Sequence, residues 1–418
     1  MATVLVAWEL GGGLGHLVPL LPLVRGLCER GHRVFAALKD LPRAGAVFDD
    51  AGVSFLQAPL RTGRVRNHIE RPRTFAHILH NVGFSDSGEL RTLAEAWRHL
   101  FDYVQPDLIL FDHSPTALLA ARTHHARRAV IGIPFACPPD AHPFPDLRPG
   151  LGDPCDLRRD EDLVLDRVNK VLASWHQPQL TRLSQLYHPV DETFLTTFQE
   201  LDHYPTRKGS QYWGVWPLAG GQPPSWPKGK GKRLFAYLKS FPALPRLLAL
   251  LNELRCPTLV YSEENDPRLR KRFQSATLRF ANQRVDPSLV CAQCDLAILN
   301  GGHGTTASML MAGKPILQLP IYLEQKLNAA ATIRLGAGLS ARIGRPEEIA
   351  VKLMALLCSE KHTEAARRFA RRYADFDPKG QLGKALRRTE ELVCRDVGTA
   401  RESSVNTVVA ASARIAAS

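Results

Sequence analysis

The stretch from Asp295 to Asn328 constrains the fold of this chain more than any other part of the sequence. An apolar segment, 296–299, runs into a glycine-rich turn, 301–304, and the small and apolar residues that follow predict a helix. Gly313 predicts the end of that helix before a second apolar segment, 316–319. Strand, glycine turn, helix and strand in this order indicate a parallel α/β sheet.

The same turn is suited to bind an anion. A helix N-terminus has backbone N–H groups without intrahelical partners and a partial positive charge, and glycines let a ligand oxygen approach the main chain. We expect the following residues to face a phosphate: Gly301, Gly302, Gly304 and Thr305. After the second strand, Glu324 and Gln325 offer a carboxylate and an amide to a ligand rich in hydroxyl groups.

The N-terminus predicts a second unit of the same kind. A strand over Val4 to Trp8 leads into a loop with four glycines, 11–15, and an apolar helix follows from Leu17 to Arg30. A dinucleotide-binding GxGxxG pattern would need a glycine where His16 stands, so a nicotinamide-dependent enzyme is disfavoured.

A further apolar segment, Asp107 to Phe111, ends at Asp112. In an open parallel sheet, ligands bind at the carboxyl ends of the strands, and His16 emerges at that same edge. We therefore expect the side chains of His16 and Asp112 to lie close together.

These patterns resemble those of the UDP-glycosyltransferase superfamily, the inverting enzymes of the GT-B fold, and more distantly those of MurG-like enzymes. In the first loop the resemblance rests on the pattern GGGxGHxxP, which ends at Pro19; MurG-type enzymes read GGTGGH there instead. In the C-terminal signature it rests on Gly301, Gly302, Gly304, Thr305, Gly313, Pro315, Pro320, Gln325, Asn328 and Ala329, with Glu324 in place of an aspartate.

The resemblance implies an α/β chain with two Rossmann-like domains whose parallel sheets face a central cleft. It implies that His16 is the general base and that Asp112 orients it. It also implies that a hydroxyl in the Ser240 loop contacts the donor phosphate and that the backbone at Val285 pairs with the nucleobase. The full donor-binding set is Gly15, Ser240, Val285, Asn300, Gly301, Gly302, His303, Gly304, Thr305, Glu324 and Gln325.

Two positions depart from the family pattern. Asn300 stands where the family has a histidine that reaches the donor diphosphate, and Ser308 stands where it has a glutamate that contacts the ribose. An amide carries no charge, so another group should compensate. We expect His303 to do so, with Lys239 and Ser240 as a second source.

The chain divides into an acceptor-binding domain (1–216), a linker rich in proline, glycine and lysine (217–232), a nucleotide-sugar domain (233–378), a helix that crosses back (379–395) and a tail (396–418). We expect the last residues of the segment 201–216 to form the closing strand of the first domain. The acceptor should face two loops, 59–73 with five arginines and 131–150 with many prolines and aromatic residues.

The net charge of +13 over 418 residues suits an anionic partner such as a nucleotide sugar or a membrane surface. No nucleic-acid-binding motif is found, and no DxD-type pair predicts a metal ion near the cleft. No run of 18 apolar residues is present, so we expect a cytoplasmic protein. The eight cysteines are scattered, which is not typical of a disulfide scaffold.

We therefore expect a metal-independent, inverting glycosyltransferase without a cofactor. It would move a sugar from a UDP- or dTDP-sugar to a hydroxyl of a small-molecule or lipid acceptor. The alternative is a non-catalytic protein on the same scaffold that assists another transferase. The sequence leaves open the sugar, the acceptor, the nucleobase and the oligomeric state.

Overall fold

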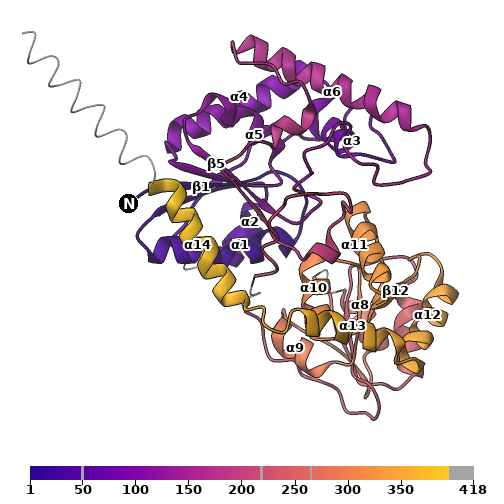
Figure 1. Ribbon diagram of the computed structural model, residues 1–418. Coiled ribbons are helices and arrows are strands. Elements are labelled where there is room, and N and C mark those ends of the chain that lie inside the picture. The colour runs from indigo at the N-terminus through magenta and orange to yellow at the C-terminus, as the bar shows by residue number, and fades with distance from the viewer. Residues whose placement is uncertain (49–50, 217–219, 264–265, 395–418) are drawn as a thin grey trace, which may run out of the picture.

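The computed structural model describes residues 1–48, 51–216, 220–263 and 266–394. These residues form two lobes, each built on a six-stranded parallel sheet with helices on both faces (Figure 1). The prediction of an α/β chain with two parallel sheets is confirmed.

The first lobe contains the N-terminal half of the chain. Its strands are β1 (Thr3–Trp8), β2 (Arg33–Leu38), β3 (Ser54–Gln57), β4 (Leu108–Asp112), β5 (Arg127–Gly132) and β6 (Glu192–Leu195). Its longer helices are α1 (Leu14–Glu29), α2 (Leu41–Phe48), α3 (Phe75–Leu79), α4 (Ser87–Val104), α5 (Pro115–Ala120) and α6 (Pro154–Ser174). Single turns are η1 (His80–Phe84), η2 (Ala121–Thr123), η3 (Leu183–Leu186) and η4 (Gln199–Leu201).

The second lobe repeats the alternation of strand and helix. Its strands are β7 (Leu234–Tyr237), β8 (Thr258–Tyr261), β9 (Leu278–Phe280), β10 (Leu296–Leu299), β11 (Ile316–Gln318) and β12 (Gly338–Ser340). Its helices are α7 (Leu244–Glu253), α8 (Pro267–Phe273), α9 (Pro287–Gln293), α10 (His303–Met311), α11 (Leu323–Arg334), α12 (Pro346–Cys358) and α13 (Lys361–Arg372), and α14 (Pro378–Cys394) ends the described chain.

Both sheets have the same strand order. The first runs β3-β2-β1-β4-β5-β6, and the second, read in the same direction, runs β9-β8-β7-β10-β11-β12. This is the Rossmann order, in which the chain reverses its direction of travel between the first and fourth strands of a sheet. A crevice opens at that switch point, between β1 and β4 in one lobe and between β7 and β10 in the other.

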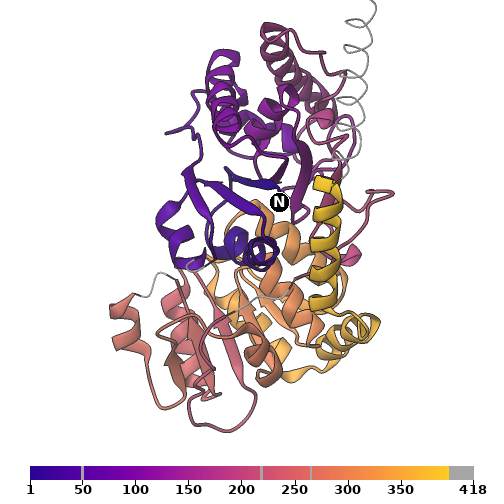
Figure 2. The same cartoon turned by 90° about the vertical axis from the view of Figure 1, so that its left-hand side faces the viewer.

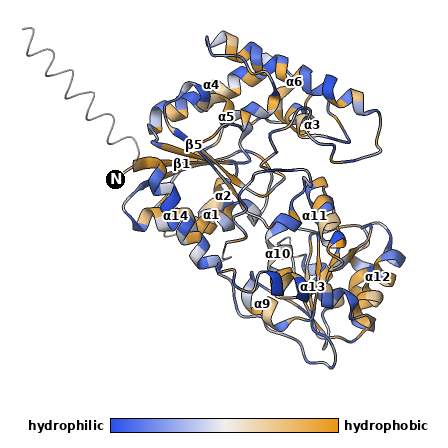
Figure 3. Cartoon of the chain, in the orientation of Figure 1, coloured by the Kyte–Doolittle hydropathy of each residue, from blue (hydrophilic) through white to orange (hydrophobic). Residues whose placement is uncertain are grey.

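The central strands are buried because helices cover both faces of each sheet. Val4 to Trp8 and Leu108 to Phe111 are apolar without alternation, as expected for parallel strands covered on both sides. Helices α1 and α2 pack on one face of the first sheet and α3 to α6 on the other. Figure 3 shows the apolar residues gathered on the strands and the polar ones on the outer faces of the helices.

Helix α14 leaves the second lobe and packs on the first, where it contacts α1. Figure 2 shows α14, in yellow, beside the first lobe. Ala385, Leu386 and Leu392 join the apolar cluster between α1 and the first sheet. The contact is close because residue 26 of α1 is glycine: a Cβ there would lie 2.8 Å from a methyl carbon of Leu386. The last helix thus holds the two lobes together.

One sequence-based expectation differs from the structure. The strand that closes the first sheet is β6 (Glu192–Leu195), whereas Tyr212 contributes only an isolated bridge to Leu195. In the linker, residues 217–219 lie outside the described residues. The rest is packed on the second lobe, where Gln222 pairs with Val285 and the Trp226 indole donates to Gln293.

Candidate active site

His16 and Asp112 meet at the switch point of the first sheet. His16 lies in the first turn of α1, directly after β1, and Asp112 is the last residue of the neighbouring strand β4. The Nδ1 atom of His16 is 3.0 Å from each carboxylate oxygen of Asp112. The structure thus brings together the pair expected to be a base and its orienting carboxylate.

The environment of His16 sets its protonation behaviour. Burial disfavours the imidazolium, but the charge and hydrogen bond of Asp112 outweigh it, so the pKa of His16 is raised above its ordinary value. Because Nδ1 faces Asp112, Nε2 is the nitrogen left to exchange a proton with a substrate.

Two aromatic rings that sequence reasoning missed hold the imidazole of His16. Trp8 stacks on it with ring centroids 5.4 Å apart, and His113 stacks at 6.0 Å. Burial lowers the pKa of His113 to about 3, so this second ring is neutral and adds no charge beside the base. Their positions in the sequence could have indicated this, since Trp8 is the last residue of β1 and His113 directly follows β4.

The glycine loop before α1 passes close to the Nε2 atom of His16. Gly11 has a φ of +79°, and a Cβ at this position would lie 2.1 Å from Nε2 of His16. The Lys39 ammonium donates to the carbonyl oxygen of Gly11 over 2.7 Å and fixes the loop. Glycine is therefore required here, both for its backbone conformation and for the space it leaves.

The second switch point holds the other glycine turn. Gly301 has a φ of +92°, and a Cβ there would lie 2.9 Å from the carbonyl oxygen of Gln325, so α11 packs directly against this turn. Gly302 is the N-cap of α10, and the space around its Cα is open. The N–H groups of the first turn of α10 have no intrahelical acceptors and border the cleft between the lobes.

Asn300, which is expected to contact the donor, forms two hydrogen bonds within the chain. Its Oδ1 accepts a hydrogen bond from the backbone N–H of Lys239 over 2.6 Å, and its Nδ2 donates to the carbonyl oxygen of Leu319 over 2.8 Å. The amide therefore joins the loops after β7, β10 and β11, and the residue also lines the cleft. Ser308 likewise bonds within the chain, since its hydroxyl donates to the carbonyl oxygen of Gly304.

The structure also changes the role expected of His303. The side chain is buried, and burial lowers its pKa to about 4, so the ring is neutral near pH 7. Its centroid lies 6.2 Å from that of His203, which is equally buried. His303 borders the cleft but does not supply the positive charge that we expected as compensation for Asn300.

Glu324 and Gln325 begin α11 on the same side of the cleft. The Gln325 Oε1 accepts hydrogen bonds from the N–H groups of Ile321 and Tyr322, which leaves its NH₂ group for a ligand. Burial raises the pKa of Glu324, and the nearby His16 and Lys239 oppose that shift. Glu324 lines the same cleft as His16 of the first lobe and Lys239 of the second.

A cavity of about 250 Å³ lies between the two switch points. The predicted residues that line it are Gly15, His16, Asp112, Val285, Asn300, Gly302, His303, Gly304, Thr305, Glu324 and Gln325. Lys239, Glu263 and Arg284 add charges to its wall, and several apolar side chains of both lobes complete it. Ser240 is exposed and does not line this cavity, and Gly301 lies beneath it.

No family model matches this sequence. A PGL/p-HBAD biosynthesis glycosyltransferase of Mycobacterium tuberculosis is 36% identical over 88 residues, 20% of this chain and 21% of that protein. The match thus spans about a fifth of that relative. A PGL/p-HBAD biosynthesis rhamnosyltransferase of Mycobacterium bovis is 25% identical over 312 residues, 67% of each chain.

Solved structures match over nearly the whole chain. The calicheamicin glycosyltransferase CalG4 has a TM-score of 0.68 at 18% identity, covering 94% of this chain and 99% of that one. The spinosyn rhamnosyltransferase SpnG, complexed with thymidine diphosphate, has a TM-score of 0.62 at 17% identity, covering 94% of this chain and all of that one. The protein has the GT-B fold of these glycosyltransferases.

In this GT-B chain the linker shapes the wall of the cleft at Val285. The backbone N–H of Gln222 donates to the carbonyl oxygen of Arg284, and its carbonyl oxygen accepts from the N–H of Asp286. The N–H and C=O of Val285, which lies between them, therefore point away from the linker. Gly221 permits this pairing, because a Cβ there would lie 2.6 Å from main-chain atoms of Val285 and Asp286. The backbone of Val285 thus offers an adjacent donor and acceptor.

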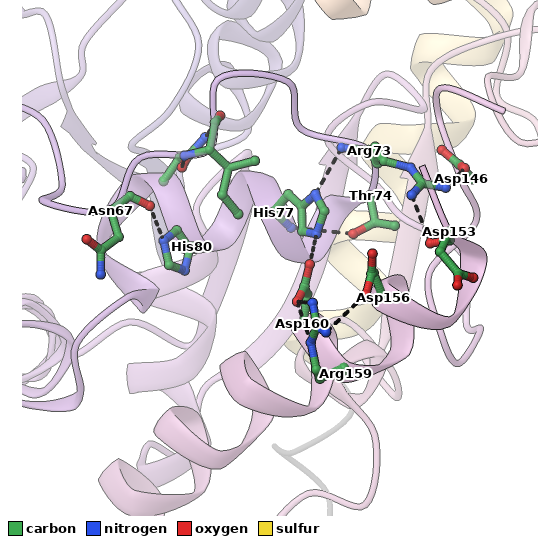
Figure 4. Close-up of polar contacts among 12 residues, drawn as sticks. Asn67, Arg73, Thr74, His77, His80, Asp146, Asp153, Asp156, Arg159 and Asp160 are labelled. Carbon is green, nitrogen blue, oxygen red and sulfur yellow. Dashed lines mark hydrogen bonds and ion pairs between the residues drawn. The ribbon is translucent and has the colours of Figure 1, made fainter. Parts of the chain in front are cut away.

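The two loops expected to face the acceptor are fastened to the first lobe of this GT-B fold. Figure 4 shows the Arg73 guanidinium, which donates to the Asp146 carboxylate. It also shows His77, whose Nδ1 accepts from the backbone N–H of Arg73 and whose Nε2 is hydrogen-bonded to the Asp160 carboxylate. Another arginine of the 59–73 loop, Arg61, pairs with Glu89 of α4. None of these residues lines the cavity between the lobes, to which the 131–150 segment contributes Ile131, Gly132 and Ile133.

Within the described ranges, no three His, Cys, Asp or Glu side chains gather closely enough to hold a metal ion. No helix of those ranges is long and apolar enough to span a bilayer. Cys291 and Cys294 are buried beside Met309, and burial raises the pKa of both thiols to about 12.

Proposed function

We propose that this protein is an inverting glycosyltransferase that moves a sugar from a nucleoside-diphosphate sugar to a hydroxyl of a small-molecule or lipid acceptor. The observation that carries the proposal is the position of the His16–Asp112 pair, which faces the first turn of α10 across one cavity. A base and an anion site that share a cavity suit a transfer from a phosphate leaving group to an oxygen nucleophile.

In the proposed reaction the Nε2 atom of His16 takes the proton of the acceptor hydroxyl as its oxygen attacks the anomeric carbon. Asp112 keeps the ring oriented and stabilises the imidazolium that forms. The new glycosidic bond forms as the bond to the diphosphate oxygen breaks, and this single displacement inverts the anomeric centre.

The nucleoside diphosphate leaves with the bonding electron pair and carries the developing negative charge. The N–H groups of Gly302 to Thr305, the Thr305 hydroxyl and the partial charge of the α10 N-terminus would stabilise it. We propose that these donors act without a metal ion. The backbone of Val285 would pair with uracil or thymine, and the match to a chain complexed with thymidine diphosphate supports this class of donor.

The apolar walls of the cavity and the names of the similar proteins support a hydrophobic natural product or a glycolipid as the acceptor class.

The alternative function is that of an auxiliary GT-B protein without activity. It is favoured by Asn300 and Ser308, whose side chains form hydrogen bonds within the chain. The intact His16–Asp112 pair favours an enzyme.

Release of nucleoside diphosphate from a panel of UDP- and dTDP-sugars, with phenolic and macrolide acceptors present, tests the proposal. An enzyme should release diphosphate only when an acceptor is present and only with His16 in place. If the protein binds nucleotide sugars but releases no diphosphate with any acceptor, the auxiliary role is correct.

A further inference from the structure

A diphosphate at the first turn of α10 calls for a cation in the cleft, and Asn300 and His303 do not provide one. Lys239 lies in the loop after β7, on the opposite side of the switch point from the α10 turn, and it lines the cavity. Its Nζ lies 4.0 Å from the point where a Cβ of Gly13 would stand. The ammonium is therefore next to the glycine loop of the first lobe and faces the glycine turn of the second.

Among the described residues, no carboxylate lies within ion-pair distance of the Lys239 ammonium. Its Nζ lies over the ring of Tyr322, 5.6 Å from the ring centroid. Glu324 and Glu263 are the carboxylates on the same wall, and Glu263 accepts a hydrogen bond from the Tyr237 hydroxyl. A cation that borders an enclosed cavity without a counter-ion is suited to an anionic ligand.

Asn300 sets the position of Lys239. Its Oδ1 holds the backbone N–H of Lys239 over 2.6 Å, while its Nδ2 is anchored on Leu319. The residue that departs from the family pattern therefore acts on the loop that carries the lysine. Where the family pattern has a histidine after β10, this chain has an amide that fixes the loop carrying a lysine after β7.

We propose that Lys239 neutralises the diphosphate of the sugar donor and that Asn300 is the positioning residue that holds its loop. The proposal rests on the proposed function, since it needs a nucleoside diphosphate in the cleft. The lysine recognises phosphate charge and not the base, so its contribution depends on the number of phosphates in the ligand.

Calorimetry with uridine, uridine monophosphate and uridine diphosphate, and with the thymidine series, tests this on the purified chain. Lys239→Met should weaken diphosphate binding by about 10- to 100-fold, as expected for one charge-assisted contact, while nucleoside binding changes less than about threefold. Lys239→Arg should retain most of the diphosphate affinity. Lys271→Met, which removes an exposed lysine of α8 outside the cavity, should bind every ligand like the parent.

The role of Asn300 has its own readout. In the parent protein, Asn300→Ala should weaken diphosphate binding more than nucleoside binding. In the Lys239→Met variant it should weaken both equally, because Asn300 acts through the contact between Lys239 and the diphosphate. A residue that only stabilises the fold would weaken nucleoside and diphosphate equally in both backgrounds, and that result would remove Asn300 from its positioning role.

The outcomes separate this inference from the proposed function. If the parent binds nucleoside diphosphate more tightly than nucleoside, and Lys239→Met keeps the same preference, the role of Lys239 is wrong and the proposed function stands. If the parent binds neither nucleotide series, the proposed function itself is wrong and the role of Lys239 falls with it. Nucleoside affinity also shows that each variant is folded.

Discussion

The Nδ1 atom of His16 lies 3.0 Å from both carboxylate oxygens of Asp112, a residue 96 positions away in the chain. The contact exists because β1 and β4 are neighbours in the sheet, with Trp8 opposite Asp112 in the register. Helix α1, which follows the glycine loop after β1, then places His16 beside the end of β4. The pair is thus a product of the switch point, where two strands distant in sequence end side by side.

The first prediction concerns the proposed base. Because His16 is proposed to accept a proton in the transition state, His16→Ala should lower kcat by about 10²- to 10⁴-fold with little change in donor affinity. Steady-state rates of diphosphate release and calorimetric donor affinity check both parts. Near-normal turnover of the variant would exclude His16 as the base.

The second prediction concerns pH. Asp112 outweighs the effect of burial and raises the pKa of His16, and a general base must be unprotonated. The kcat/KM of the parent should therefore rise with pH through an apparent pKa above about 6.5, the ordinary value for histidine. In Asp112→Asn the burial remains but the charge is lost, so this limb should move to lower pH while the plateau rate falls. A limb that does not move would show that another group titrates.

The third prediction uses two adjacent glycines as a matched pair. The space around Gly302 is open and its backbone conformation suits any residue, so Gly302→Val should fill the anion site and abolish donor binding while the fold survives. Gly301→Ala places a Cβ against α11 at a positive φ, so it should lower the free energy of unfolding by about 1–3 kcal/mol. Urea unfolding and calorimetry on both variants check this. Unchanged donor affinity in Gly302→Val would argue against phosphate at this turn.

The fourth prediction concerns the helix that returns to the first lobe. Leu386 is buried against Gly26, so Leu386→Ala should lower the free energy of unfolding of the first lobe by about 2–5 kcal/mol. Lys384→Ala, on the exposed face of the same helix, is the control and should change it by less than about 0.5 kcal/mol. Equal stability of both variants would show that α14 does not brace the first lobe.

The sequence by itself predicted parallel strands and helices in both halves of the chain and the glycine turns that border the cleft, while the arrangement as two Rossmann-like domains came from the family resemblance. Local rules suffice for the strands, helices and turns: apolar runs without alternation give buried parallel strands, glycines at 301 and 313 bound a helix, and His16 follows a strand and glycine loop. The meeting of His16 and Asp112 could also be expected, because parallel strands present their carboxyl ends at one edge.

Only the tertiary structure decided which polar side chains are available to a ligand. The sequence pattern predicts that Asn300 contacts a ligand, but its side-chain amide forms hydrogen bonds to the loops after β7 and β11. The sequence pattern suggests a cation at His303, but burial beside His203 keeps the ring neutral. Two arginines of the 59–73 loop, Arg61 and Arg73, pair with carboxylates of other segments. Hydrogen-bond partners and burial come from residues remote in sequence, so a local pattern predicts which residue stands at the site but not which of its atoms remain free.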